Sequence, residues 1–387
     1  MIQANYLQSI CIRTAPHVTP AMLSADYWIA RQPNPDQRIL SPEEIETKSL
    51  PAASRLSFPD LQAPETRWGI CCAESGIFYQ PTRKQTKDEE DPWSDENRFS
   101  GILVNEPVWI LKTSADGQWF RIRTCFGSGW VQRRFIAECR SRREWLDAQD
   151  PEALFLIVTA GRLTLLPQRT APQKEPASYR MGTCLRLIPA LQAPKTIDGR
   201  FYLDNYVVRI PARDPDGFLS WDYQLIPVSA DVHIGFLPYT RRQLLCQIFK
   251  LQGDIYGWGD MYRSHDCSSY AMAVYRCFGF RLARDSSDQA RMPFPSIDLK
   301  GLKPAEKKAA LRRSAPGSLL WFQGHIMLYL GWQDDRYYSI SAAGRCCLHS
   351  GEPAVSAGTA FLCELGSICR KNGRSWLSEL QKVLEPR

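Results

Sequence analysis

The sequence lacks several features that would assign it to a special class of protein. It contains no run of 18 or more apolar residues, so no transmembrane helix is expected. Its formal charge of +7 is modest for 387 residues, and the basic residues are spread along the chain. We find no nucleic-acid-binding motif and expect no nucleic acid as a partner. The amino terminus has no basic segment before an apolar one, which argues against a signal peptide.

Histidine is scarce, and the cysteines have no metal-binding pattern. The chain has five histidines and thirteen cysteines, and no Cys-x-x-Cys occurs. Neither a disulfide framework nor a zinc site fits this spacing, so we expect no metal and no cofactor. Most of the cysteines are interpreted as reduced and partly buried, which favours a reducing compartment. A cytoplasmic location is therefore favoured, with the cell envelope or secretion as the alternative.

The length of the chain indicates several domains. A hydrophobic content of 44% is typical of a soluble globular protein, and 387 residues exceed one ordinary domain. Proline-rich and polar stretches divide the sequence into parts. We expect the protein to be a monomer. The predicted parts are an amino-terminal extension at 1–62, a small β-barrel at 63–145, a second small β-barrel at 146–232 and a domain of helices and strands at 233–387.

The first predicted barrel has a clear hairpin pattern. Strands are expected at 104–111 and 118–123, joined by a polar turn with glycine at 114–117. Short strands separated by turn residues repeat through the second barrel. A long polar loop is expected within 80–98, and loops of that length are often functional.

The last domain begins with helices and continues with strands. Apolar residues at helical spacing predict helices, and continuous apolar runs predict strands. This order predicts an α+β layout. The expected helices are 241–251, 267–279, 304–313 and 375–384, and the expected strands are 318–322, 325–332 and 337–341.

A cysteine and a histidine in this domain form a candidate nucleophile pair. Cys267 lies at a helix start, where unpaired N–H groups and the helix dipole favour an anion. We therefore expect a lowered thiol pKa and a thiolate. His325 heads the apolar strand and is a plausible base, so the two residues indicate Cys–His nucleophilic catalysis. The neighbouring His265 is expected to face solvent.

These residues resemble the NlpC family of papain-like peptidoglycan peptidases. The barrels resemble bacterial SH3-like modules of one branch, the γ-D-glutamyl-L-diamino acid endopeptidases, and 26–29 resembles the stabilising segment of that branch. The resemblance implies an α+β papain-like catalytic domain, with helices packed on an antiparallel sheet, preceded by two small SH3-like β-barrels. The motifs that carry it are 235–240, 256–259, 266–269, 274–279, 284–289 and 324–331.

The resemblance also implies catalytic roles. The cysteine at position 267 would attack the amide carbonyl, and His325 would be the general base. A third polar residue, most often histidine in the family, orients that base. Ser341 stands at the third position here, and a serine hydroxyl is a weaker orienter than a histidine or a carboxylate. His349, eight residues later, is the alternative orienter.

Substrate contacts follow from the same resemblance. It assigns Asp266 to the free amine of an N-terminal L-alanine, and Ser268, Trp258 and Ser286 to the first two residues of the peptide. The loop within 80–98 would wall off the site beyond that amine. Simpler roles remain open: Asp266 as a helix cap, Trp258 as a core residue and Ser286 as a helix N-cap.

The predicted function is therefore that of a cysteine endopeptidase acting on peptidoglycan stem peptides, its expected partners. It would hydrolyse the bond between γ-D-glutamate and a diamino acid in peptides with a free N-terminal L-Ala, during muropeptide turnover or recycling. Two alternatives remain. One is a catalytically weakened or inactive cell-wall-peptide-binding protein. The other is an amidase or acyltransferase that uses the same Cys–His pair on another substrate.

Overall fold

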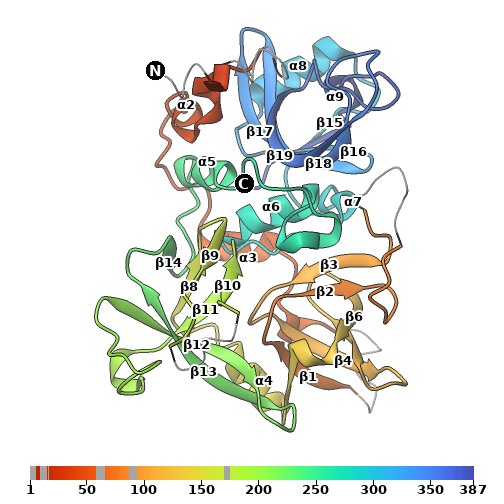
Figure 1. The fold of residues 1–387 in the computed structure, drawn as a ribbon. Helices are drawn as coiled ribbons and strands as arrows, with labels where there is room; N and C mark the ends of the chain where they lie inside the picture. Colours follow the sequence, from red (N-terminus) through yellow and green to blue (C-terminus); the bar gives the residue numbers. More distant parts are fainter. Residues whose placement is uncertain (1–5, 9–14, 16, 58–65, 87–93, 170–174) are drawn as a thin grey trace. The chain divides into compact units, whose positions relative to one another are not determined.

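A computed structural model describes most of the chain, and the described residues fall into two compact units (Figure 1). No helix among them is long and apolar enough to cross a membrane. The described residues are 6–8, 15, 17–57, 66–86, 94–169 and 175–387. The first unit comprises 1–49, 87–95 and 238–387, and the second comprises 50–86 and 96–237.

The first unit contains a six-stranded antiparallel sheet with the strand order β15-β20-β16-β17-β18-β19. Three of its strands, β16 to β18, were predicted. The strands are β15 (Ser296–Asp298), β16 (Leu319–Phe322), β17 (His325–Gln333), β18 (Arg336–Cys346), β19 (Val355–Glu364) and β20 (Lys382–Leu384). The helices are η1 (Pro20–Leu23), α2 (Ala25–Ile29), α3 (Pro42–Lys48), α5 (Arg241–Phe249), η6 (Trp258–Arg263), α6 (Cys267–Arg276), α7 (Ser286–Gln289), α8 (Pro304–Arg313) and α9 (Trp376–Glu379).

Helix α6 lies against strands β17 and β18, with α5 also packed against it (Figure 1). Every residue of α6 from Ser268 to Tyr275 is buried. A helix that is enclosed on all sides needs small or apolar side chains around its whole circumference, and alanine, methionine and valine supply them here. This packing fixes the start of α6 beside the sheet.

The predicted helices agree with the structure except at the carboxyl end. Helices α5, α6 and α8 form where they were predicted. The helix predicted at 375–384 is wrong beyond Glu379, because Lys382–Leu384 forms β20 between β15 and β16. Backbone pairing on both sides of β20 overrides the local helical spacing of its apolar residues.

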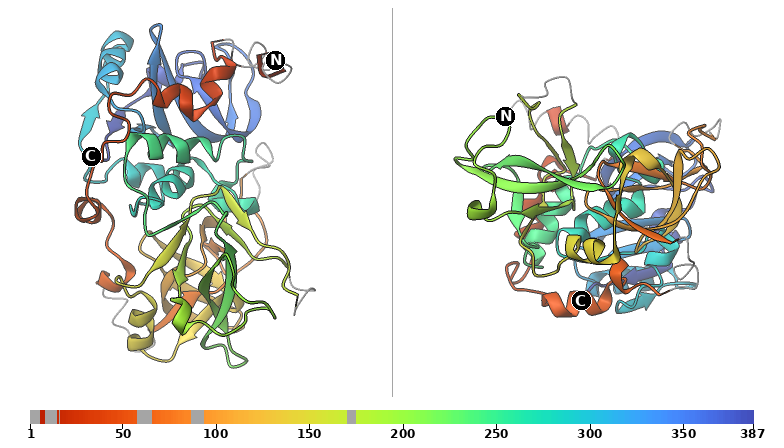
Figure 2. Two further views of the ribbon diagram at one scale, coloured as in Figure 1. Left: turned by 90° about the vertical axis from the view of Figure 1, so that its left-hand side faces the viewer. Right: turned by 90° about the horizontal axis from the view of Figure 1, so that it is seen from below.

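The amino-terminal segment packs on the first unit (Figure 2). Trp28 on α2 is buried, its Nε1 donates to the Met22 carbonyl at 2.9 Å, and its ring lies 5.4 Å from that of Tyr338 on β18. Ser41 begins α3 and forms a capping box with Glu44. The segment is therefore part of the structure that supports the sheet.

The second unit is built from antiparallel strands and contains the regions where the two barrels were predicted. A seven-stranded sheet has the order β3-β2-β6-β5-β4-β1-β7, and the predicted hairpin is β4 paired with β5. Trp109 and Trp119 are buried in its core. Its strands are β1 (Arg67–Cys71), β2 (Ser75–Phe78), β3 (Arg98–Ile102), β4 (Pro107–Thr113), β5 (Trp119–Arg123), β6 (Ser128–Gln132) and β7 (Ile136–Cys139), with η2 (Ala53–Arg55), η4 (Arg133–Phe135) and α4 (Arg142–Ala148).

The rest of the second unit contains a five-stranded sheet with the order β13-β12-β11-β8-β14 and a separate two-stranded sheet, β10-β9. Strand β13 was not predicted. A second SH3-like barrel and the four-part domain division remain predictions. The elements are β8 (Phe155–Val158), β9 (Arg162–Thr164), β10 (Ser178–Arg180), β11 (Cys184–Leu187), η5 (Ala190–Gln192), β12 (Asn205–Arg213), β13 (Leu219–Pro227) and β14 (Val232–Ile234).

Candidate active site

The start of α6 is defined by Asp266, which is its N-cap. Asp266 Oδ1 accepts from the amide of Ser269 at 2.9 Å, and the Ser269 hydroxyl accepts from the Asp266 amide at 2.9 Å. This reciprocal capping satisfies two backbone donors that the helix cannot satisfy itself. Cys267 is consequently the first residue of the helix, as predicted.

Cys267 faces the strand that carries His325. As a whole residue Cys267 is partly exposed, and its thiol interacts with the backbone amides of Ile326 and Ser268. Ile326 directly follows His325 on β17, so Cys267 lies beside the start of the strand that carries the candidate base. His325 is also partly exposed as a whole residue.

Ser341 on β18 lies next to the imidazole. Its Oγ is 2.9 Å from His325 Nε2, and the same oxygen lies 3.3 Å from the Ile326 carbonyl and 3.4 Å from the Ala342 carbonyl. When the hydroxyl donates to one of these carbonyls, it accepts from Nε2–H of the imidazole. In that tautomer Nδ1 is unprotonated and can accept a proton. The alternative orienter, His349, lies on the wall of a separate cavity.

The surroundings keep both members of the pair neutral. Burial raises the pKa of the Cys267 thiol to about 12, and the Asp266 carboxylate acts in the same direction. Burial lowers the pKa of His325 to about 4, and Arg370 adds to this effect. The predicted resting thiolate is therefore wrong, because burial and a neighbouring carboxylate outweigh the helix start.

A buried arginine forms an ion pair with Asp266. Arg284 Nη2 and Nη1 donate to the two oxygens of Asp266 at 2.6 and 3.2 Å. Burial by itself would lower the pKa of Arg284, but Asp266, Asp260 and Asp285 outweigh it and raise the pKa. Asp266 and Asp260 are both buried, so the cluster holds two buried carboxylates and one buried guanidinium.

Asp266 is therefore the helix cap, one of the roles that the sequence left open, and it also accepts hydrogen bonds from residues outside the cap. In addition to Ser269 and Arg284, the amide of Gly259 donates to its Oδ2 at 3.1 Å, and the Ser268 hydroxyl donates to its Oδ1 at 3.0 Å. Ser268 Oγ also accepts from Arg284 Nη1 at 2.9 Å. Asp266 and Ser268, two of the four residues that the resemblance assigned to substrate, are thus engaged within the protein.

Trp258 lies on a loop with unusual backbone geometry. The η6 segment contains Asp260, Tyr262 and Arg263 in the left-handed region, with φ of 64°, 58° and 56°. Such conformations cost energy for residues other than glycine and often mark functional sites. The Trp258 side chain is 43% exposed, so its reading as a core residue is wrong and its indole is accessible.

Two further residues near the site differ from their sequence interpretation. Ser286 is the first residue of α7 and partly exposed, whereas Asp285 occupies the N-cap position, so the N-cap reading of Ser286 is wrong. His265 was expected to face solvent but is only 5% exposed. The backbone of His265 pairs with Tyr256, and its carbonyl accepts from the Gly257 amide at 3.0 Å. These backbone contacts hold His265 in the interior.

The sequence analysis missed three residues that surround the pair. Arg284 was quoted only as part of a motif, although a buried arginine implies a carboxylate partner. Phe322 and Trp376 contact the His325 ring, with centroid distances of 5.3 and 4.8 Å. No local pattern identifies Trp376, because it is 51 residues away from His325 in the chain. Phe322 pairs with His325 across β16 and β17, so its contact follows from the hairpin.

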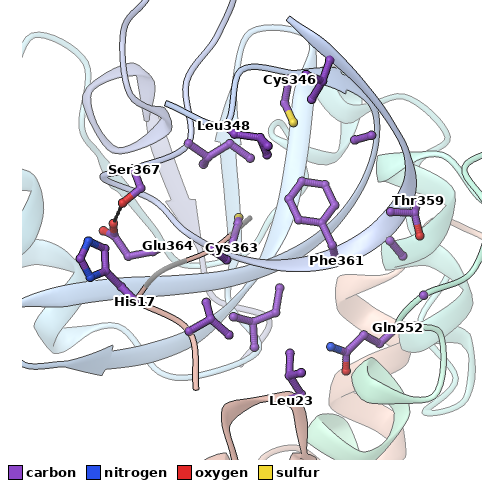
Figure 3. A pocket seen from close by; sticks show the side chains of 18 of the residues that line it. His17, Leu23, Gln252, Cys346, Leu348, Thr359, Phe361, Cys363, Glu364 and Ser367 are labelled. Atoms are coloured by element: carbon purple, nitrogen blue, oxygen red, sulfur yellow. Dashed lines mark hydrogen bonds between the residues drawn. The ribbon is translucent and has the colours of Figure 1, made fainter. Parts of the chain in front are cut away.

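A cavity of about 440 Å³ lies elsewhere in the first unit (Figure 3). Phe361, Cys363 and Leu348 form much of its apolar wall, and Glu364 accepts a hydrogen bond from Ser367 at one end. Neither Cys267 nor His325 lines this cavity. The twelve described cysteines are all free thiols.

Comparison with known proteins identifies two domains. Residues 253–345 match the model of the NlpC/P60 family, and residues 82–132 match that of an SH3 domain of the SH3b1 type. The predicted fold class is confirmed: an NlpC/P60 domain with helices on an antiparallel sheet follows an SH3-like region. Members of the NlpC/P60 family are cysteine peptidases, generally endopeptidases of cell-wall peptidoglycan.

Solved structures share the fold. An NlpC/P60 endopeptidase from Photobacterium damselae subsp. piscicida is 16% identical with a TM-score of 0.67, over 88% of this chain and 77% of that chain. An NlpC/P60 family protein from Bacillus cereus ATCC 10987 is 15% identical with a TM-score of 0.52, over 82% of this chain and 99% of that one. Among curated proteins, the comparison finds no match.

Proposed function

We propose that this NlpC/P60 domain is a cysteine endopeptidase that hydrolyses the γ-D-glutamyl–diamino acid bond of peptidoglycan stem peptides with a free N-terminal L-Ala. Muropeptide turnover or recycling is the process in which we place it. One observation carries the proposal. His325, adjoining the backbone that Cys267 contacts, is held through Nε2 by Ser341 at 2.9 Å, which leaves Nδ1 for a proton from the thiol.

The proposed reaction starts from the neutral pair. As Cys267 Sγ attacks the amide carbonyl, its proton passes to the imidazole of His325, and Ser341 keeps the Nε2–H hydrogen bond. The amide of Cys267, at the first position of α6, has no acceptor within the helix and can stabilise the oxyanion. The imidazolium then returns the proton to the leaving amine. Water hydrolyses the thioester, which regenerates the thiol and releases the acid.

Charge at the start of α6 supports recognition of an amine. Asp266 and Asp260 are buried carboxylates at this end of the helix, and Asp285 lies close to both Arg284 and Asp266. Carboxylates attract an ammonium group such as that of an N-terminal L-Ala. Asp266 contributes to this recognition through its charge, because its oxygens already accept hydrogen bonds from the protein.

Two of the remaining proposed substrate contacts are accessible, since Trp258 is exposed and Ser286 is partly exposed. The third, Ser268, is buried next to the nucleophile in the sequence. The loop predicted to close the site spans 80–98, of which 87–93 lie outside the described residues. Its described end, Ser94 and Asp95, is buried and belongs to the same compact unit as Cys267, which is consistent with this role.

Incubation with L-Ala-γ-D-Glu-diaminopimelate tests this proposal. Mass spectrometry should detect L-Ala-D-Glu and free diaminopimelate with the wild-type protein, and neither product with Cys267→Ala. The N-acetylated tripeptide should be cleaved at least tenfold more slowly, because acetylation removes the ammonium charge. An intact free-amine tripeptide after incubation with the wild-type protein would overturn the proposal.

A second candidate function keeps the Cys–His pair but changes the substrate. The bidentate Arg284–Asp266 ion pair favours it, because both oxygens of Asp266 already accept hydrogen bonds from the protein itself. In this case the protein is an amidase or acyltransferase whose amide substrate has no free amino group. Equal cleavage of free and N-acetylated peptides, dependent on Cys267, would identify it.

A further inference from the structure

We propose that Trp376 is the main positioning residue for His325 and takes over part of the role that a stronger third catalytic residue would have. This inference rests on the proposed function of the Cys267–His325 pair. Trp376 lies on α9, beyond the stretch 253–345 that matches the NlpC/P60 family.

Three rings form one compact cluster around the base. The centroid of the His325 imidazole lies 4.8 Å from that of Trp376 and 5.3 Å from that of Phe322. Trp376 and Phe322 are themselves 5.8 Å apart. Each ring therefore contacts the other two. At these distances, rotation of the imidazole about its side-chain bonds would bring it into collision with a neighbouring ring.

The need for such packing follows from Ser341. A hydroxyl is a neutral partner, and its hydrogen bond to Nε2 is weaker than that of a carboxylate. One hydrogen bond also leaves the imidazole free to swing about the line between the two bonded atoms. Contacts with the faces and edges of Trp376 and Phe322 restrict this motion, which Ser341 alone leaves unrestrained.

Trp376 is well fixed for this task. Its side chain is 3% exposed, and its amide donates to the Ile368 carbonyl at 2.9 Å. The N-cap residue Ser375 accepts from the Ser378 amide at 3.2 Å, which sets the start of α9. On another side, the ring of Phe361 lies 6.4 Å from that of Trp376. Because Trp376 is fixed in this way, its ring can restrict the motion of the His325 imidazole.

The same packing excludes water from the base. Burial is the largest cause of the lowered pKa of His325. Trp376 and Phe322 are large apolar groups in contact with this imidazole, so they supply part of that burial. Removal of Trp376 should therefore release the ring and also hydrate it. The two effects can be measured separately.

The test compares Trp376→Ala and Trp376→Phe with a control, Leu377→Ala. Leu377 is buried beside Trp376 on α9 and packs in the same core cluster. Trp376→Ala should lower kcat on L-Ala-γ-D-Glu-diaminopimelate by tenfold or more and change KM less than twofold. It should also raise the pKa of His325, followed by NMR of the imidazole, by one unit or more. Trp376→Phe should restore most of both values.

Leu377→Ala should reduce thermal stability. Its kcat should stay within twofold of the wild-type value, and the pKa of His325 should change by no more than about 0.3 units, the measurement error. Equal losses in Leu377→Ala and Trp376→Ala, or an unchanged His325 pKa in Trp376→Ala, would overturn the proposal. If the wild-type protein leaves the tripeptide intact, the proposed function fails, and the NMR measurement still decides whether Trp376 controls the surroundings of His325.

Discussion

At the scale of single residues, Cys267 and His325 each lie in surroundings that favour the uncharged form. The sequence predicted where both residues lie, because a cysteine at a helix start and a histidine at a strand start are local patterns. It gave the wrong resting charge, because burial of the thiol and the position of Asp266 depend on tertiary packing. The Arg284–Asp266 ion pair was missed for the same reason: the partners are 18 residues apart.

The lowered pKa of His325 predicts an acid-tolerant enzyme. A general base must be neutral to accept the thiol proton, and His325 stays neutral until the pH falls to about 4. In a pH–rate profile, kcat/KM should therefore stay nearly constant from pH 7 to about 5 and fall below that range. An acid limb near pH 6.5, the ordinary histidine value, would contradict this account.

Removal of the Ser341 hydroxyl should have a moderate effect. Ser341→Ala deletes one hydrogen bond to the imidazole, worth about 1 kcal/mol, so kcat should fall about fivefold while KM changes little. Steady-state kinetics on the tripeptide measure both constants. A loss of about a thousandfold would show that Ser341 itself, and not the aromatic packing, fixes the base.

At the scale of secondary-structure elements, the sequence predicted what depends on nearby residues. Helices α5 and α8 have their apolar side chains at helical spacing, and both form where predicted. Strands β15, β19 and β20 were missed. Strand β20 depends on neighbours far along the chain, because it pairs with β15 and β16, and spacing within a short segment carries no information about such partners. Strand β19 pairs with the strand that precedes it, β18.

The start of α6 offers a stability test at this scale. Asp266→Ala removes the helix cap and leaves Arg284 buried without its partner, which should cost about 3–5 kcal/mol in the free energy of unfolding. Asp266→Asn keeps an acceptor oxygen for the Ser269 amide and should restore the cap contribution of about 1 kcal/mol. Urea denaturation measures both values. Equal stability of the two variants would exclude a capping contribution.

At the scale of the whole molecule, the described residues form two compact units, and the amino-terminal segment belongs to the unit with Cys267. Sequence patterns suggested the extension and the barrels, but the grouping of 17–49 with the last domain depends on contacts such as that of Trp28 with Tyr338. No spacing rule predicts a contact across about 300 residues.

This grouping predicts separate unfolding. Trp28→Ala should destabilise the first unit by about 3–5 kcal/mol, because a fully buried ring leaves a cavity. The matched control is Trp145→Ala, which removes an equally buried indole from the second unit. Calorimetry should show that each substitution lowers a different transition. Parallel shifts of a single transition in both variants would mean that the units unfold together.

The central claim is that His325 activates Cys267. The most direct measurement is the rate at which iodoacetamide alkylates each cysteine, followed by quantitative mass spectrometry at pH 7 in the wild-type protein and in His325→Ala. Although the resting thiol is neutral, His325 can accept its proton as the sulfur attacks. We therefore predict that Cys267 reacts faster than the other partly exposed cysteines, Cys72, Cys125, Cys184 and Cys246, and that His325→Ala abolishes this advantage. Slow, uniform labelling of all five, unchanged in His325→Ala, would contradict it.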